Sequence, residues 1–124
     1  MTEPKLVAVY GTLKLGRGND HYLREAAFLG TTVTDPEYRM YSMGYYPAVA
    51  KVEEEGMPIH LEVYSVSDPE TLENLDSLEG YKGKGNPRNL YDVEEIVTKF
   101  GPAKMYVMPL SKVAGRKLVE SGNW

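Results

Sequence analysis

Two short segments have the residue types for a small-molecule site. The first, Tyr10-Gly11-Thr12-Leu13, follows an apolar run, and Gly11 lacks the side chain that would keep a ligand away from the backbone. Consecutive backbone N–H groups in such a turn can hold a carboxylate or stabilise a developing oxyanion. The alternative is an ordinary turn after a first strand, because a glycine is common at that place.

The second segment places Glu79 at the predicted end of a helix. Leu72, Leu75 and Leu78 recur at a spacing of three residues and form one apolar face. Gly80 is expected to end the helix directly after Glu79. A carboxylate at the rim of an apolar face becomes partly buried, which raises its pKa and makes it usable as a general base. The alternative is a solvated glutamate, one of eighteen acidic residues in the chain.

The sequence has no pattern typical of a metal, nucleotide or nucleophilic serine or cysteine site. The two histidines, His21 and His60, have no further ligands at suitable spacing, so we expect no metal. The segment Gly16-Arg17-Gly18 has neither the dinucleotide fingerprint nor the P-loop pattern, and no Gly-x-Ser-x-Gly elbow occurs. The chain has no cysteine, which excludes disulfides, thiol nucleophiles and cysteine-bound metals. We therefore expect no cofactor.

Length and charge limit the partners. The 124 residues suit one compact domain over residues 1–124. A net charge of −4 and a pI near 5.2 disfavour nucleic acid. No apolar stretch approaches the roughly 20 residues that a membrane span needs, and the N-terminus lacks a signal pattern. We expect a cytoplasmic protein without a membrane partner, whereas its oligomeric state is left open.

The periodicity predicts about six strands and two or three short helices. Strands are expected at 6–10, 31–34, 38–43 and 59–66, with a hairpin of 90–100 and 103–108. Helices are expected at about 20–28, ended by Gly30, and from Pro69 to about Glu79, capped by Ser67 or Asp68. A short turn is expected at 115–120. This balance predicts an α+β fold with a curved or barrel-like sheet.

Five short motifs occur in the order found in one protein family. They are Val9-Tyr10-Gly11-Thr12-Leu13-Lys14 with Gly18-Asn19, Gly44-Tyr45-Tyr46-Pro47-Ala48-Val49, Glu62-Val63-Tyr64, Leu75-Asp76-Ser77-Leu78-Glu79-Gly80-Tyr81 and Asn86-Pro87-Arg88-Asn89-Leu90-Tyr91. Together they resemble the γ-glutamylcyclotransferase-like superfamily, which includes γ-glutamylamine cyclotransferases, plant avirulence-induced proteins and small bacterial relatives. Two positions depart from the family pattern. Leu61 stands where a glycine is usual, and Val93 stands where an arginine is frequent.

The resemblance implies a small mixed β-barrel with short flanking helices and a cavity beside the first-strand loop. Tyr10, Gly11, Thr12 and Leu13 would line the substrate pocket through backbone groups, and Glu79 would be the general acid and base. The substrate would be a γ-glutamyl amide or amine, which cyclises to 5-oxoproline and releases its amine without metal, nucleotide or redox cofactor.

Two tyrosines, Tyr91 and Tyr106, are candidates for the pocket of such an enzyme. They either shape its wall or hydrogen-bond to Glu79, and the alternative is that both are ordinary strand residues.

Three other functions stay open at this point. The same site could remove a γ-glutamyl group from a biosynthetic intermediate. It could also be a non-catalytic binding module with the same cavity. A pure interaction protein would need no cavity at all.

Overall fold

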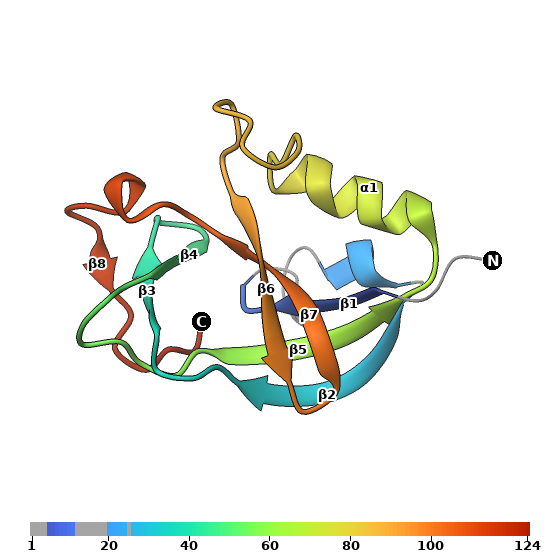
Figure 1. The fold of residues 1–124 in the computed structure, drawn as a ribbon, viewed down its shortest axis with the longest axis horizontal. Helices are drawn as coiled ribbons and strands as arrows, with labels where there is room; N and C mark the ends of the chain where they lie inside the picture. The colour runs from blue at the N-terminus through green and yellow to red at the C-terminus, as the bar shows by residue number, and fades with distance from the viewer. Residues whose placement is uncertain (1–4, 12–19, 25) are drawn as a thin grey trace.

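A computed structural model describes residues 5–11, 20–24 and 26–124 of the chain. This part of the chain has one α-helix, eight strands and two 3₁₀ helices, and Figure 1 shows how they are arranged. In chain order, the elements are β1 (Lys5–Val9), η1 (Asp20–Leu23), β2 (Ala27–Val33), β3 (Tyr38–Ser42), β4 (Pro47–Lys51), β5 (His60–Val66), α1 (Pro69–Leu78), β6 (Asp92–Thr98), β7 (Gly101–Val107), η2 (Leu110–Lys112) and β8 (Lys117–Leu118).

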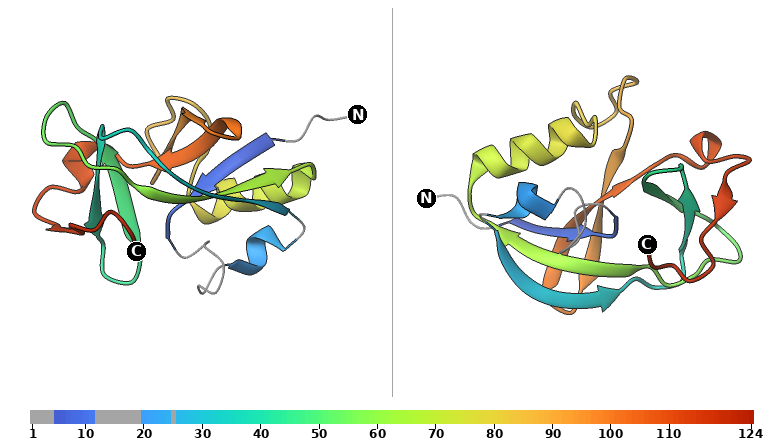
Figure 2. Two further views of the ribbon diagram at one scale, coloured as in Figure 1. Left: turned by 90° about the horizontal axis from the view of Figure 1, so that it is seen from below. Right: turned by 180° about the vertical axis from the view of Figure 1, so that it is seen from behind.

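The strands form two sheets. The larger sheet has the order β2-β5-β1-β7-β6, in which β1 runs parallel to β7 and every other neighbouring pair is antiparallel. The smaller sheet has the order β4-β3-β8. Figures 1 and 2 show β2 and β5 as long curved strands, with α1 on one side of the larger sheet and the smaller sheet beyond its far end.

The central strand β1 is buried on both faces, which explains its uninterrupted apolar sequence. Val7 and Val9 point into one core cluster, together with Leu75 of α1, and Ala8 points into a second cluster with Met105 of β7. Alternate residues of a strand face opposite sides of its sheet, so a strand between two cores has no polar face. The predicted strand at 6–10 is confirmed as β1.

The helix α1 begins where the sequence predicts. The Asp68 side chain accepts a hydrogen bond from the Glu70 backbone N–H at 3.1 Å and another from the Thr71 hydroxyl at 3.1 Å. Pro69 occupies the first turn, where its missing N–H costs nothing. The predicted hairpin is confirmed as β6 and β7, and the predicted strands at 38–43 and 59–66 are confirmed as β3 and β5.

Three predictions about the fold are wrong. In the described residues the strands form two open sheets rather than a closed barrel, and there are eight strands instead of about six. The helix predicted over 20–28 is also absent from the described part of that segment, which has only the short η1 before β2 begins at Ala27. Pairing of β2 with β5 overrides the local helical signal there.

Gly30 does not end a helix but lies inside β2, next to an irregularity in its register with β5. Its φ is +145°, and a Cβ there would lie 2.8 Å from the ring of Phe100. The close approach of this ring, from the β6–β7 turn, is the observed reason for a glycine. None of the described helices is long and apolar enough to cross a membrane.

Candidate functional site

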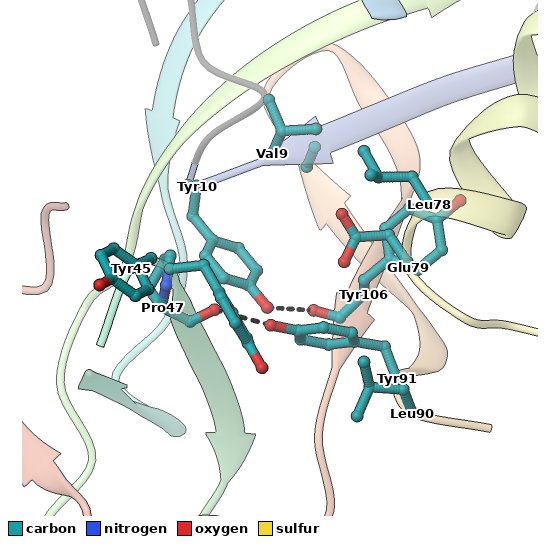
Figure 3. Close-up of a pocket in the computed structure, with 12 residues that line it drawn as sticks. Val9, Tyr10, Tyr45, Pro47, Leu78, Glu79, Leu90, Tyr91 and Tyr106 are labelled. Atoms are coloured by element: carbon teal, nitrogen blue, oxygen red, sulfur yellow. Dashed lines mark hydrogen bonds between the residues drawn. The ribbon is translucent and has the colours of Figure 1, made fainter. Parts of the chain in front are cut away.

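A cavity of about 320 Å³ lies where the ends of β1 and α1 meet the loop before β4. Figure 3 shows the side chains around it, which are mostly aromatic or aliphatic. The lining residues are Ala8, Val9, Tyr10, Gly11, Tyr45, Tyr46, Pro47, Leu78, Glu79, Leu90, Tyr91 and Tyr106. Among the described residues that line the cavity, Glu79 has the single charged side chain.

Glu79 caps the C-terminus of α1, and its half-buried carboxylate points into the cavity (Figure 3). Burial raises the pKa of Glu79 from its ordinary value of 4.5 to about 7. Within the described part of the chain, no hydroxyl, amide or cationic side chain forms a hydrogen bond or ion pair with this carboxylate. A carboxylate with a pKa near 7 can exchange a proton with a ligand near neutral pH.

The turn after α1 fixes the position of Glu79. Gly80 has a φ of +68°, and the backbone N–H groups of Gly80 and Tyr81 donate to the carbonyls of Ser77 and Asp76. This is the hydrogen-bond pattern of a Schellman motif, which ends a helix with a left-handed residue. The helix therefore stops at the residue whose side chain enters the cavity.

The chain then returns to the same turn from a distant position. The backbone N–H of Leu90 donates to the Gly80 carbonyl at 3.0 Å, and that of Tyr91 donates to the Glu79 carbonyl at 3.3 Å. A Cβ on Gly80 would lie 2.9 Å from the Cβ of Leu90, so the two segments are in close contact. These contacts place Tyr91 beside Glu79.

Asn89 holds the intervening loop in shape. Its buried side chain accepts a hydrogen bond from the Lys82 backbone N–H at 2.6 Å and donates to the Gly83 carbonyl at 2.8 Å. The Lys112 ammonium donates to the Asn89 carbonyl at 2.6 Å. Asn89 belongs to one of the five sequence motifs but has no role predicted from the sequence, and an asparagine that follows the turn glycines Gly83 and Gly85 was the available signal for a loop anchor.

Tyr10 is buried, and its hydroxyl is fully occupied. The hydroxyl donates to the Tyr106 carbonyl at 2.7 Å and accepts from the Val49 backbone N–H at 3.3 Å. Burial raises the pKa of Tyr10 well above its usual range, and the nearby Tyr91 and Glu79 raise it further. Tyr10 is therefore a neutral structural hydroxyl whose ring forms part of the cavity wall.

Gly11 also lines the cavity, but the structure gives its own reason for a glycine. A Cβ at this position would lie 2.8 Å from two ring carbons of Pro47. The close neighbour is therefore a protein side chain, from the first residue of β4. Thr12 and Leu13, the rest of the predicted loop, lie outside the described residues.

Tyr91 and Tyr106 both lie in the cavity wall, and neither donates its hydroxyl to Glu79. The Tyr91 hydroxyl donates to the Pro47 carbonyl at 2.8 Å, and the Tyr106 hydroxyl donates to Asp76 Oδ1 at 2.6 Å. Burial is the largest cause that raises the pKa of each tyrosine above its usual range, and Glu79 adds to both shifts. Of the two roles predicted for them, the structure places them as the wall.

The mouth of the cavity includes residues that sequence reasoning quoted but did not assign. Tyr45 is 96% exposed at the rim, and the neighbouring Tyr46 and Leu90 are partly exposed. An aromatic pair directly after Gly44, which has a φ of +107°, was the available signal for an exposed rim. Within residues 5–11, 20–24 and 26–124, no three potential metal-ligating side chains come together.

One acid–base group in an aromatic cavity is typical of a small-molecule site. Comparisons with known proteins assign the chain to a family. Residues 7–124 match the family described as "Gamma-glutamyl cyclotransferase, AIG2-like". The chain is 39% identical over 118 residues to the "Gamma-glutamylcyclotransferase family protein YtfP" of Escherichia coli K12. The match covers 95% of this chain and 94% of the relative. The chain belongs to this γ-glutamylcyclotransferase family.

Two further relatives extend the comparison. The crystal structure of protein PH0828 from Pyrococcus horikoshii superposes with a TM-score of 0.74 at 31% identity, covering 96% of this chain and 88% of that one. A protein of Niallia circulans named "Gamma-L-glutamyl-butirosin B gamma-glutamyl cyclotransferase" is 37% identical over 84 residues. That match spans 68% of this chain and 51% of the relative.

Proposed function

We propose that this chain converts a γ-glutamyl amide or amine to 5-oxoproline and a free amine, with Glu79 as general acid and base. The observation that carries the proposal is the Glu79 carboxylate, which is half-buried in the cavity and has no partner in the described part of the chain. The family assignment supports the substrate class, because the Escherichia coli and Niallia circulans relatives have γ-glutamyl cyclotransferase in their names.

The reaction needs little chemistry from the protein. The α-amine of the γ-glutamyl group attacks its own γ-carbonyl, a C–N bond forms in the five-membered ring, and the bond to the leaving nitrogen breaks. Because the nucleophile and the electrophile belong to one molecule, the cavity has to hold the chain in a folded conformation. The buried tyrosine rings and Pro47 provide rigid walls for this purpose.

Proton transfer is the task of Glu79. The α-amine enters as an ammonium group and cannot attack until it loses a proton, which the Glu79 carboxylate accepts. The resulting carboxylic acid then donates a proton to the leaving nitrogen. A glutamate with a pKa of about 7 is a stronger base than a solvated one and is still able to give the proton back.

The carboxylate of the substrate requires hydrogen-bond donors. No described lining residue has a cationic side chain, so we assign this task to the backbone N–H groups of the Tyr10–Leu13 loop. The same groups could instead stabilise the oxyanion of the tetrahedral intermediate. In either case the substrate lies between the end of β1 and Glu79.

The test is the replacement Glu79→Gln, which keeps the shape and removes the base. Wild type and variant are incubated with a panel of γ-glutamyl compounds, and mass spectrometry follows 5-oxoproline and the free amine. Glu73→Gln is the matched control, because Glu73 is exposed on the same helix. We expect loss of turnover in the Glu79 variant alone. Full 5-oxoproline release by that variant would refute the mechanism.

A second candidate is removal of a γ-glutamyl group from a larger biosynthetic intermediate. The Niallia circulans relative has γ-L-glutamyl-butirosin B in its name, and the exposed Tyr45 and Leu90 at the rim leave space for a large amine outside the cavity. Turnover of bulky conjugates in preference to γ-glutamyl dipeptides would favour this candidate. Tight binding without turnover of any conjugate would instead indicate a binding module.

A further inference from the structure

Asp76 lies one helical turn before Glu79, and the proposed reaction gives it no role. Residues three apart on a helix are neighbours on its surface, so the two carboxylates lie on the same side of α1. Asp76 Oδ1 accepts a hydrogen bond from the Tyr106 hydroxyl at 2.6 Å and forms an ion pair with the Lys104 ammonium at 2.6 Å. Lys104 and Tyr106 are alternate residues of β7 and so project from the same face of the larger sheet.

The two partners of Asp76 are a cation and a hydroxyl, and their contacts with Asp76 hold them within one helical turn of Glu79. Tyr106 lines the cavity with its ring and has a hydroxyl that can donate a hydrogen bond. Lys104 has an ammonium group, which lies 5.3 Å from the ring centre of Tyr106 and 5.4 Å from that of Tyr81. A hydroxyl or a cation directed at Glu79 would stabilise its charged form and make it a weaker base.

The remaining titratable groups around the cavity have other partners or lie at its mouth. Tyr10 donates to the Tyr106 carbonyl, and Tyr91 donates to the Pro47 carbonyl. Tyr45 and Tyr46 lie in the rim, where Tyr45 is almost fully exposed. Asp76 therefore binds a cation and a hydroxyl, both on β7, one helical turn away from Glu79.

We propose that Asp76 is a positioning residue, which holds the Lys104 ammonium and the Tyr106 hydroxyl away from Glu79 and so keeps the Glu79 carboxylate available to the substrate ammonium. This inference rests on the proposed function for its consequence in catalysis. Its electrostatic part, the effect of Asp76 and Lys104 on the titration of Glu79, can be measured without any substrate.

The test begins with Asp76→Asn. Asparagine keeps the size of the side chain and still accepts the Tyr106 hydrogen bond, but it leaves the Lys104 charge without a partner. We expect the titration midpoint of Glu79 to fall by about one pH unit, since an opposite charge close to a carboxylate lowers its pKa. Lys104→Met should shift the midpoint upwards, because Asp76 is then an uncompensated negative neighbour. The double variant should return close to the wild-type midpoint.

Two readouts follow the midpoint. The pH profile of kcat/KM reports it through turnover, and ¹³C NMR of protein labelled at the glutamate carboxyl carbons reports it directly, with Glu79→Gln identifying the signal. Without turnover in the wild type, the proposed function fails and the NMR titration still decides the positioning role. Glu73→Gln is the charge control, since it removes one exposed carboxylate from the same helix.

The outcomes separate a positioning role from a structural one. Opposite shifts in the two single variants that cancel in the double variant support the proposal. An unchanged midpoint in folded Asp76→Asn, the same shift in Asp76→Asn and the double variant, or an equal shift in Glu73→Gln would overturn it. Should Asp76→Asn fail to fold by circular dichroism, Lys104→Met decides alone, and an unchanged midpoint in that variant overturns the proposal.

Discussion

Burial of Glu79 links the chemistry of the site to the stability of the fold. Its pKa is about 7 in the folded protein and near 4.5 in an unfolded chain, so the folded state binds more protons between these pH values. The free energy of unfolding therefore decreases as the pH rises from 4.5 to 7. Above pH 7 the difference in pKa corresponds to a loss of about 3 kcal/mol in the free energy of unfolding. The partial exposure of the Glu79 side chain makes the actual loss smaller.

We predict that Glu79→Gln stabilises the protein at alkaline pH. The neutral amide has no charged form to desolvate, so the variant should gain about 1–3 kcal/mol over the wild type at pH 8. The gain should shrink as the pH falls and be near zero below pH 4.5. Urea unfolding at a series of pH values measures the difference. A gain that is independent of pH, or the same gain in Glu73→Gln, would contradict this explanation.

The same titration should appear in the activity. We predict that kcat/KM with a γ-glutamyl substrate rises with pH and levels off above a midpoint of about 7, because the free enzyme needs the Glu79 carboxylate as its base. Initial rates at low substrate concentration between pH 5 and pH 9 measure the midpoint. A midpoint near 4.5 would show that Glu79 is solvated during the reaction, or that another group is the base.

At the scale of elements, the turn from α1 into the 79–91 segment depends on Gly80. Its φ of +68° is unfavourable for other residues, and a Cβ there would meet the Leu90 Cβ at 2.9 Å. Leu90 cannot turn its Cβ away, because that atom is fixed to the backbone. Any side chain at position 80 therefore has to separate the two segments that hold Glu79 and Tyr91 together.

We predict that Gly80→Ala lowers both stability and turnover. The left-handed backbone costs about 1–2 kcal/mol, and the displacement of Leu90 adds about 1–3 kcal/mol. Gly85→Ala is a matched control, since Gly85 has a similar φ of +76° and no atom within 4 Å of its Cβ position. Thermal unfolding and kcat are measured for both variants. Equal losses in the two would show that backbone strain alone is responsible.

The elements that the sequence predicts correctly are those with local signals. Asp68 and Pro69 begin α1 through contacts within four residues, and β1 is apolar because two cores surround it. The segment 20–28 is the counter-example. Its local pattern favours a helix, whereas pairing with β5 and the Phe100 ring at Gly30 come from residues more than thirty positions away.

The candidate site shows the same division. Glu79 and Tyr10 could be chosen from the ends of predicted elements, and the structure brings them to one cavity. The residues that contact Gly11 and Tyr106 in the cavity wall could not be predicted in this way. Pro47 against Gly11 and Asp76 against Tyr106 are contacts between distant segments, and single-sequence patterns contain no information on such pairs.

At the scale of the whole molecule, the C-terminal segment completes the smaller sheet. The backbone N–H of Val119 donates to the Met40 carbonyl, and that of His60 donates to the Gly122 carbonyl. These pairings join positions 60 or more residues apart along the chain. Sequence periodicity finds the strands but not their partners, which is why a barrel was expected where the described residues form two sheets.

The Tyr10 hydroxyl joins the two sheets directly. It donates to the Tyr106 carbonyl in β7 of the larger sheet and accepts from the Val49 N–H in β4 of the smaller sheet. Next to this bridge, the backbone N–H of Met108 donates to the Val49 carbonyl at 2.8 Å. The cavity lies beside this junction, so its shape depends on how the sheets are held together.

We predict that Tyr10→Phe destabilises the protein without abolishing turnover. The ring remains as cavity wall, while two buried backbone groups lose a partner, at a cost of about 1–3 kcal/mol. Tyr45→Phe is the control, because its hydroxyl is on the surface. Thermal unfolding should show a lower midpoint for Tyr10→Phe alone, and kcat well below that midpoint should stay within about threefold of the wild type. Loss of turnover at unchanged stability would instead assign the hydroxyl to the substrate, because a group that only joins the sheets acts on the reaction through the fold.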